Sequence, residues 1–343
     1  DITDLEFLNV SKNKLTSIPE AIGRLQKLSR LYIYGNQLTE VPPGVCSLPN
    51  LEVLDVSNNN LSTFPPGVEK LQKLRELHIN DNQLTEVPSG VCSLPNLEVL
   101  NVRNNKLSTF PPGVEKLQKL RDLGIHDNQL TEVPPGVCSL PNLEALNVSN
   151  NNLSTFPPGV EKLQKLTKLG IYGNQLTEVP SGVCSLPNLE LLRVDNNKLS
   201  TFPPGVEKLQ KLRELHINSN QLTEVPSGVL SLPNHEVLNV AKNPIRRLPS
   251  DVTRLARVKT LGINDCQFDE FPRQVLQLKT LEKLYAGGCK FDIVPDEVGN
   301  LQHLWDLDVS GNPLTYPPQD VCKQGTGAIM AFLKQEAEKG EAC

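Results

Sequence analysis

The sequence predicts an α/β solenoid, in which short coils stack so that one parallel β-sheet forms a concave side and 3₁₀ or irregular segments form a convex side. Two observations predict this fold. One 23-residue pattern recurs along nearly the whole chain of 343 residues. In addition, only 4% of the residues are aromatic. A thin column of Leu and Val between stacked coils needs few aromatic side chains, whereas a thick globular core usually contains more.

An Asn marks the repeat. It first occurs at Asn13 and last at Asn312, an interval of thirteen periods of 23 residues, so the chain contains fourteen units in phase. Cys266 and Cys289 occupy the marker position in the two units that lack the Asn. A Pro follows six residues after the marker in every unit. The pattern therefore predicts fourteen coils without an insertion.

Each part of a unit has a physical role, which the third unit illustrates. The alternation of Leu54 and Val56 predicts a short strand with two inward side chains. The amide of Asn59 has donors and acceptors for the backbone of the turn that leaves the strand, and stacked copies form a ladder. Pro65 then begins a compact extended or 3₁₀ return on the opposite side.

The full pattern, L-x-x-L-x-[VI]-x-x-N-x-L-x-x-[VF]-P-x-x-V-x-x-L, resembles the leucine-rich repeat over residues 5 to about 326. This resemblance implies a horseshoe-shaped solenoid that binds its partners on the concave sheet. The consensus sequence of the unit resembles that of the repeats in intracellular Ras-pathway, LAP and Roco proteins. Two departures, His235 in place of a core Leu and Pro317 in an apolar position, predict less uniform packing toward the C-terminal end.

The C-terminal residues leave the period. Ile329, Phe332 and Leu333 are spaced for one helix face, so residues 326–338 are predicted to form a helix that covers the open end of the core. The predicted domains are accordingly a solenoid over 1–326 and a capping helix with its tail over 327–343.

The two ends of the chain differ in the caps that their sequences predict. Residues 321–333 resemble the tail of intracellular leucine-rich-repeat proteins of the Roco and death-domain kinds. No comparable cap precedes the first strand, and further sequence is therefore expected upstream of Asp1.

The eight cysteines fall into three groups. Four recur every 46 residues at Cys46, Cys92, Cys138 and Cys184. Coils about 5 Å apart would place these neighbours roughly 10 Å apart, too far for a disulfide, so they are predicted to be packing residues. Cys266 and Cys289 are either a ladder of thiols or a disulfide, and Cys322 and Cys343 are either free or bonded.

Secreted leucine-rich-repeat proteins usually carry cysteine-rich caps, and neither end of this chain has a cluster of that kind. Cysteine usage therefore favours a reducing, cytoplasmic compartment. A recognition function would instead favour the cell surface or the extracellular space, and the sequence leaves these alternatives open.

Composition argues against several classes of function. The net charge of −5 argues against a nucleic-acid partner, and no apolar run approaches the roughly 20 residues that membrane insertion requires. His78 is expected beside Asp55 with Ser57 nearby, but an open sheet has no oxyanion hole. His78 and His126 are two coils apart without a third ligand. The sequence predicts no enzyme, no cofactor and no metal site.

Variation within the chain indicates a binding surface. Residues 37–82, 83–128, 129–174 and 175–220 are four copies of a double unit. Most differences among them fall on outward strand positions, whereas the convex Glu-Lys-Leu-Gln-Lys-Leu segment is identical in all four. The concave face is thus interpreted as diversified on a fixed frame, the alternative being accidental change among few copies. The pattern is similar to that of the variable lymphocyte receptors of jawless vertebrates.

The concave face also has an uneven charge. Asp55, Asp81, Asp122 and Asp127 are opposed over the same units by Arg103. Such an acidic patch favours cationic or amine-bearing ligands. The predicted ligand-binding residues are Asp55, His78, Asn80, Asp81, Arg103, Asp122, His126, Asp127 and Tyr172.

These residue types fit more than one ligand. Asp, Asn and His suit hydrogen bonds to sugar hydroxyls, and Tyr offers a flat contact surface. The function predicted first is non-enzymatic immune recognition of a microbial surface glycan, polymer or protein. The alternative is an intracellular protein-interaction scaffold of the Ras-pathway, LAP or Roco type.

Overall fold

The computed structural model describes residues 2–341, and within them the predicted solenoid is confirmed. Fourteen three-residue strands alternate with 3₁₀ helices, and two α-helices follow the last strand. The chain forms two compact units, which divide between Leu176 and Thr177. The predicted boundary between 1–326 and 327–343 stays a prediction.

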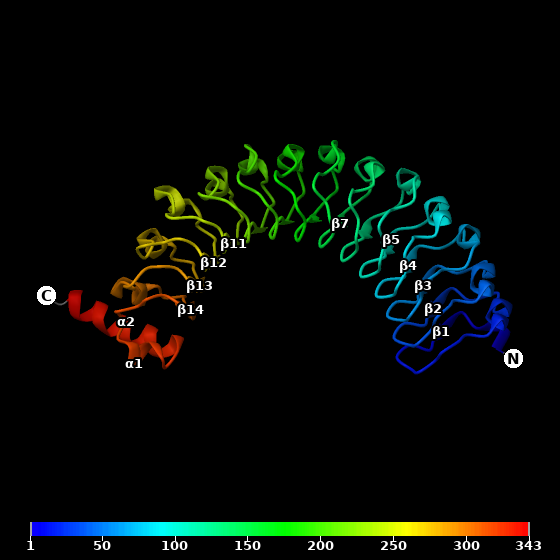
Figure 1. Ribbon diagram of the computed structural model, residues 1–343, viewed down its shortest axis with the longest axis horizontal. Helices are drawn as coiled ribbons and strands as arrows, with labels where there is room; N and C mark the ends of the chain where they lie inside the picture. Colours follow the sequence, from blue (N-terminus) through cyan, green and yellow to red (C-terminus); the bar gives the residue numbers. More distant parts are fainter. Residues whose placement is uncertain (1, 342–343) are drawn as a thin grey trace. The chain divides into compact units, whose positions relative to one another are not determined.

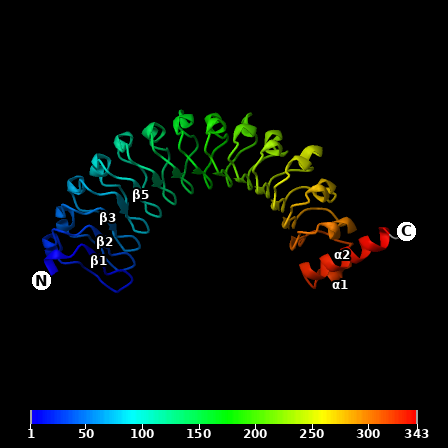
Figure 2. The same ribbon diagram turned by 180° about the vertical axis from the view of Figure 1, so that it is seen from behind.

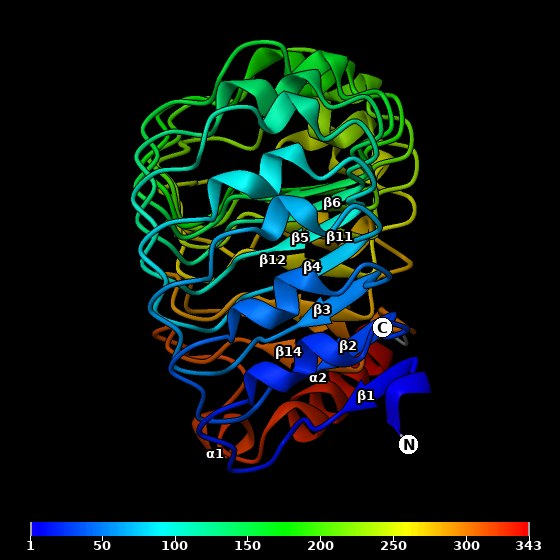
Figure 3. The same ribbon diagram turned by 90° about the vertical axis from the view of Figure 1, so that its right-hand side faces the viewer.

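The first unit contains eight parallel strands that pair in chain order (Figure 1, blue to green). They are β1 (Phe7–Asn9), β2 (Arg30–Tyr32), β3 (Val53–Asp55), β4 (Glu76–His78), β5 (Val99–Asn101), β6 (Asp122–Gly124), β7 (Ala145–Asn147) and β8 (Lys168–Gly170). The 3₁₀ helices of this unit lie on the opposite side of each coil (Figure 3). They are η2 (Glu20–Arg24), η3 (Pro43–Ser47), η4 (Val68–Lys70), η5 (Ser89–Ser93), η6 (Val114–Lys116), η7 (Pro135–Ser139) and η8 (Val160–Lys162), whereas η1 (Ile2–Asp4) directly precedes β1.

The second unit repeats this arrangement with six parallel strands. They are β9 (Leu191–Arg193), β10 (Glu214–His216), β11 (Val237–Asn239), β12 (Thr260–Gly262), β13 (Lys283–Tyr285) and β14 (Asp306–Asp308). Its 3₁₀ helices are η9 (Ser181–Ser185), η10 (Val206–Lys208), η11 (Ser227–Ser231), η12 (Ser250–Arg254), η13 (Arg273–Gln277) and η14 (Asp296–Asn300).

The predicted asparagine ladder is present. Asn82 donates from Nδ2 to the carbonyl of Ile79 and to that of Val56 in the preceding coil, both at 3.2 Å. Its Oδ1 accepts a hydrogen bond from the backbone N–H of Leu61 at 3.0 Å. The amide thus satisfies buried backbone groups of two coils and joins them.

Two thiols continue the same ladder. Cys266 Sγ donates to the carbonyl of Val240 at 3.5 Å and Cys289 Sγ to that of Ile263 at 3.3 Å, matching Asn243 Nδ2, which donates to Ile217 at 3.0 Å. Both cysteines are free, so the thiol-ladder prediction is confirmed and the alternative disulfide between them is wrong. The proposed Cys322–Cys343 pair lies outside the described residues, because these end at 341.

The four regularly spaced cysteines are free and buried, as predicted for packing residues. Burial raises the pKa of each thiol to about 11. The thiolate is therefore disfavoured, and these side chains act as small apolar groups.

The C-terminal cap consists of α1 (Gln319–Cys322) and α2 (Thr326–Glu341), so the predicted helix is confirmed and is longer than expected. Ile329 and Leu333 on α2 are buried, and Phe332 contacts Tyr316 with ring centroids 5.6 Å apart. None of the helices in the described part of the chain is long and apolar enough to span a bilayer.

His235 is a polar residue in the core of the second unit, and the less uniform packing expected there stays a prediction. The side chain occupies an inward Leu position, is 1% exposed, and has no hydrogen-bond partner at Nδ1 or Nε2. Burial lowers the pKa of the imidazole to about 4, so the ring is neutral in the folded protein at pH 7.

Candidate ligand-binding face

The strands of the first unit line the inner side of its curve (Figure 2). In β2 to β8 the central Leu is buried, whereas Leu8 in β1 is half-buried. The two neighbours of the central Leu point away from the core, because side chains alternate along a strand. The register pairs Asp55 with His78, and His78 with Asn101. Residues predicted from separate coils therefore lie side by side on this face.

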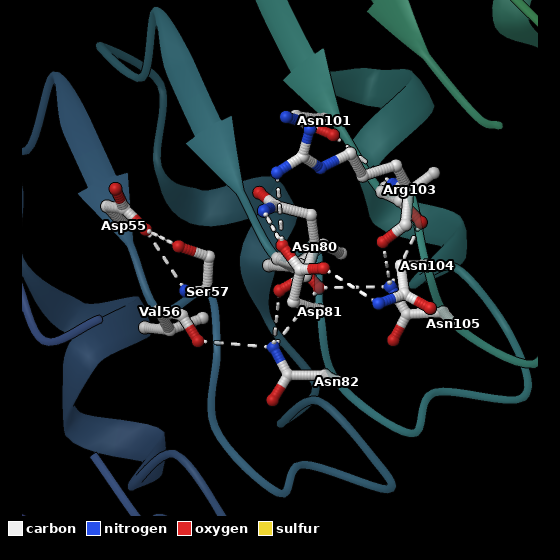
Figure 4. A network of polar contacts seen from close by, with 12 residues as sticks. Asp55, Val56, Ser57, Asn80, Asp81, Asn82, Asn101, Arg103, Asn104 and Asn105 are labelled. Carbon is white, nitrogen blue, oxygen red and sulfur yellow. Dashed lines mark hydrogen bonds and ion pairs between the residues drawn. The ribbon is translucent and has the colours of Figure 1, made fainter. Parts of the chain in front are cut away.

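Asp81 is the centre of a polar network (Figure 4). Its Oδ1 accepts from Asn104 Nδ2 at 2.8 Å, and its Oδ2 accepts from Asn80 Nδ2 at 2.6 Å and from Arg103 at 3.4 Å. Burial acts to raise the pKa of Asp81, but these hydrogen bonds and the Arg103 charge hold the pKa below its usual value. The predicted residues Asn80, Asp81 and Arg103 are thus brought together.

Asp55, Ser57 and His78 do not form a catalytic triad. Ser57 donates from Oγ to Asp55 at 2.6 Å and from its backbone N–H at 3.0 Å. His78 Nε2 instead lies 3.3 Å from Glu76 on its own strand. The Ser57 hydroxyl therefore donates to the Asp55 carboxylate and not to His78. In a Ser-His-Asp triad the serine hydroxyl contacts the histidine.

Asp122 and His126 have pKa values shifted mainly by burial. Asp122 as a whole residue is exposed, but desolvation of its carboxyl group raises its pKa. The charges of Lys168 and His78 act to lower this pKa and offset only part of the rise. Burial lowers the pKa of His126, whose Nδ1 has no hydrogen-bond partner. His126 lies over Gly124, where a Cβ would be 3.6 Å from Nδ1. A Cβ at Gly124 would therefore lie in van der Waals contact with the imidazole.

Asp127 repeats the Asp81 arrangement two coils further on, where it accepts from Asn150 Nδ2 at 2.8 Å. Tyr172 lies two coils beyond Asp127 and is half-buried. Its backbone carbonyl accepts from the backbone N–H of Asn150 at 2.8 Å. The strand spacing places Tyr172 roughly 19 Å from Asp81, so the predicted residues form a row along the face rather than one cluster.

A polar recess of about 580 Å³ lies beside Asp81, where the chain leaves β3, β4 and β5. It is lined by Asn58, Asn59, Asp81, Asn82, Gln83, Asn104, Asn105 and Lys106. Every lining residue is polar or charged, so the recess offers hydrogen-bond donors and acceptors and little apolar contact surface.

Sequence reasoning missed Asn104 and Asn150, although they hold Asp81 and Asp127. These asparagines are identical in the four double units, and the site had been chosen from positions that vary. The repeat itself contained the signal, because Asn104 lies one period after Asp81 at the same left-handed turn position, with φ of 49° and 54° respectively. Asn and Asp tolerate that conformation better than most residues.

Side chains in the described residues contain no group of three His, Cys, Asp or Glu that could hold a metal ion. His78 and His126 are on β4 and beyond β6, as the repeat requires. Side-chain contacts on this face include hydrogen bonds and an ion pair.

Comparison with protein families finds a match to the leucine-rich repeat region at residues 1–84, 66–169 and 112–227. A 66-residue segment is 35% identical to leucine-rich repeat serine/threonine-protein kinase 1 of Mus musculus. That match covers 19% of this chain and 3% of the kinase.

Solved structures show the same fold over nearly the whole chain. A leucine-rich-repeat protein of Leptospira interrogans is 30% identical with a TM-score of 0.87, covering 94% of this chain and 82% of that one. The ectodomain of the Arabidopsis thaliana receptor kinase GASSHO1/SCHENGEN3, in complex with Casparian strip integrity factor 2, is 27% identical with a TM-score of 0.73. It covers 91% of this chain and 42% of that one. The chain therefore belongs to the leucine-rich-repeat family, whose fold is a protein-interaction fold.

Proposed function

We propose that the strand face of the first unit binds a protein or peptide ligand and that the Asp81 network is its anchor. The observation that carries this proposal is the fixed orientation and lowered pKa of the Asp81 carboxylate. Two amides and Arg103 hold its carboxylate in one geometry and lower its pKa. A charged group that is already oriented loses little side-chain entropy on binding, which favours its use in recognition.

The chemistry of the face supports a ligand with cationic or hydrogen-bond-donating groups. Asp55 and Asp127 lie on the same face as Asp81, and their partners among the described residues are a hydroxyl and an amide rather than a cation. These carboxylates keep acceptor sites for a ligand. Arg103 offsets only part of the negative charge, through Asp81.

A peptide or protein ligand is supported by the structural relatives. The Arabidopsis receptor kinase ectodomain is in complex with an integrity factor, and another plant receptor of similar fold is in complex with the peptide hormone IDA. The chain spans 42% and 58% of these two proteins, so what they bind suggests the ligand class for this face and does not establish it.

The biological role we propose is immune recognition of a microbial surface molecule, because the strand face varies among copies whose other side is constant. A second candidate, an intracellular interaction scaffold, is favoured by the seven free thiols among the described residues, since reduced cysteines are typical of the cytosol.

Binding experiments with matched variants test the proposal. We would measure binding of the purified chain to whole bacteria and its capture of cytosolic proteins, using Asp81→Asn. Asn already occupies this turn position in neighbouring coils, so the fold should be kept. Asp265→Asn is the control, because Asp265 has the same φ of 54° and accepts from Asn264 at 3.1 Å in the second unit.

We expect Asp81→Asn to weaken binding at least tenfold and Asp265→Asn to leave it unchanged. Retention of bacteria would favour immune recognition, and capture of a cytosolic protein would favour the scaffold. Equal binding by wild type and Asp81→Asn in both assays would disprove the strand-face proposal.

A further inference from the structure

The side of the second unit opposite its strands contains a groove of about 740 Å³ between η10 and η11. One wall is the segment from Ser200 to Glu207, and the other comes from Leu222–Glu224 and Pro226–Gly228. Ser231, Asp251 and Arg254 line the end toward η12, where Arg254 lies 3.9 Å from Asp251. A volume of this size is typical of ligand sites. The groove is separate from the strand face, because strands and 3₁₀ helices occupy opposite sides of each coil.

The same groove occurs in the first unit with a volume of about 330 Å³. It is lined by Phe110, Pro111, Pro112, Gly113, Val114, Glu115, Glu132, Pro134, Pro135 and Gly136. Each of these residues corresponds, 92 positions later, to a residue that lines the larger groove. The groove is therefore a recurring feature of the double unit.

The groove combines an apolar floor with carboxylates. In the larger copy the half-buried Phe202 and Pro203 form apolar surface, and Glu224 is exposed on the rim. The carboxylate of Glu207 lies against Gly228, where a Cβ would be 2.5 Å from Oε2. Neither glutamate forms an ion pair within the described residues, and the same holds for Glu115 and Glu132 in the smaller copy.

The groove sequence is constant where the strand face is not. Ser-Thr-Phe-Pro-Pro-Gly-Val-Glu is identical at 62–69, 108–115, 154–161 and 200–207. The opposite wall, Leu-Thr-Glu-Val-Pro-[Pro/Ser]-Gly-Val, follows each copy. The outward strand residues of the same four double units differ. A constant surface opposite a varied one fits a single partner that is common to all ligands of the strand face.

We propose that these grooves bind an extended, proline-containing and positively charged segment of a partner protein. Extended proline-rich segments lose little entropy on binding and dock onto grooves formed by aromatic and proline side chains. The two unpaired glutamates of each groove would pair with Lys or Arg in the segment. A partner that carries several such segments would gain affinity by engaging more than one copy.

Two sets of variants test the proposal. The first places Trp at Ser89, Pro135 and Ser227, in the three sequence copies whose two walls lie within one unit. This position is Pro in some copies and Ser in others, and Pro135 and Ser227 are exposed, so the change fills the groove without removing a buried contact. The second set is Glu86→Gln, Glu132→Gln and Glu224→Gln.

The control neutralises the same number of carboxylates on the opposite side of the coils, with Asp55→Asn, Asp81→Asn and Asp127→Asn. The probe is a phage-displayed library of random twelve-residue peptides, selected on the full wild-type chain and depleted on the Trp variant. Selected peptides are synthesised, and their Kd values are measured by fluorescence anisotropy.

We expect the selected peptides to contain Pro with Arg or Lys, to bind the Glu→Gln set at least tenfold more weakly, and to bind the Asp→Asn set within twofold of wild type. Failure to select any peptide that the Trp variant rejects would overturn the proposal, as would peptides whose binding falls only in the Asp→Asn set. If the Trp variant loses its circular dichroism signal, depletion on the Glu→Gln set replaces it and the same criteria apply.

Discussion

Asn104 donates a 2.8 Å hydrogen bond from Nδ2 to Oδ1 of Asp81 across two neighbouring coils. The same contact joins Asn150 to Asp127 two coils later, again at 2.8 Å. Each carboxylate on this edge is therefore oriented by the coil that follows it. The strand face gains fixed charges from a feature of the repeat, and neighbouring coils gain a side-chain link in addition to the buried asparagine ladder.

Removal of the Asn104 amide should raise the pKa of Asp81. In Asn104→Gly the positive φ is kept, while one of the hydrogen bonds that lower the Asp81 pKa is lost. A depressed carboxylate pKa contributes stability above the unfolded value that disappears as pH falls through the folded value, so the variant should lose this contribution at a higher pH. The loss at pH 7 should be about 1 kcal/mol. NMR titration of the Asp81 carboxyl carbon, with denaturant unfolding, measures both effects.

The matched control is Asn58→Gly, because Asn58 has a φ of 51° at the same repeat position and precedes Asp81 by one coil. Glycine there should leave the Asp81 titration unchanged. An equal shift of the pKa in both variants would show that backbone flexibility, rather than the Asn104 hydrogen bond, sets the ionisation of Asp81.

Replacement of His235 by Leu should stabilise the chain, and more so at low pH. The folded-state pKa is about 4, below the usual 6.5, so the unfolded chain binds the proton more readily and stability falls as pH drops from 6.5 to 4. His235→Leu removes this pH dependence and restores the apolar residue of other coils. We expect a gain of about 2 kcal/mol at pH 7 and a larger one at pH 5.

Denaturant unfolding followed by circular dichroism at pH 5 and pH 7 measures this difference. His216→Leu is the comparison, since His216 lies on the strand face and lines no part of the core. A gain in His235→Leu that is identical at both pH values would contradict a neutral, desolvated imidazole.

Substitution of Asn for Cys266 should strengthen the ladder. The amide can donate to the Val240 carbonyl in place of the thiol, which is a weak donor at 3.5 Å. Its oxygen would reach the backbone N–H of Ile245, as Asn243 Oδ1 reaches that of Leu222 at 3.0 Å. We expect Cys266→Asn to raise the free energy of unfolding by about 1 kcal/mol and Cys266→Ala to lower it. Equal stability of both variants in urea unfolding would show that the ladder position tolerates loss of its donor.

The fold could be predicted almost completely from the sequence, because each coil contacts only its neighbours and a local pattern specifies it. Val56, Asn59 and their equivalents determine strand, turn and ladder without distant contacts. Even the thiols of Cys266 and Cys289 were placed correctly by the period alone.

The candidate site could be predicted only in part. The period gave the position of Asp55 beside His78, but not that Ser57 would hold the Asp55 carboxylate. Partner choice depends on rotamers and on which of several neighbours lies within about 3 Å, and spacing in the sequence does not encode this. The grooves beside η6 and η10 were missed for a different reason: their residues are constant, and only varied positions had been considered.

Truncation of Leu333 tests whether α2 stabilises the second unit. Leu333 is fully buried at the end of the core, and the α2 backbone at Lys334 is so close to Gly299 of η14 that a Cβ on the glycine would overlap it. Leu333→Ala should cost about 3 kcal/mol, because it removes apolar contacts and leaves a cavity where no further coil follows. Gln335→Ala, at an exposed position of α2, is the control and should change stability by less than about 0.5 kcal/mol. Because repeats unfold through neighbour contacts, the lost cap should expose the last coils first. Hydrogen exchange that is faster in β13 and β14 of Leu333→Ala, with the first unit unchanged, is the expected result. Exchange in β13 and β14 at the wild-type rate would instead indicate that α2 packs on the end without stabilising it.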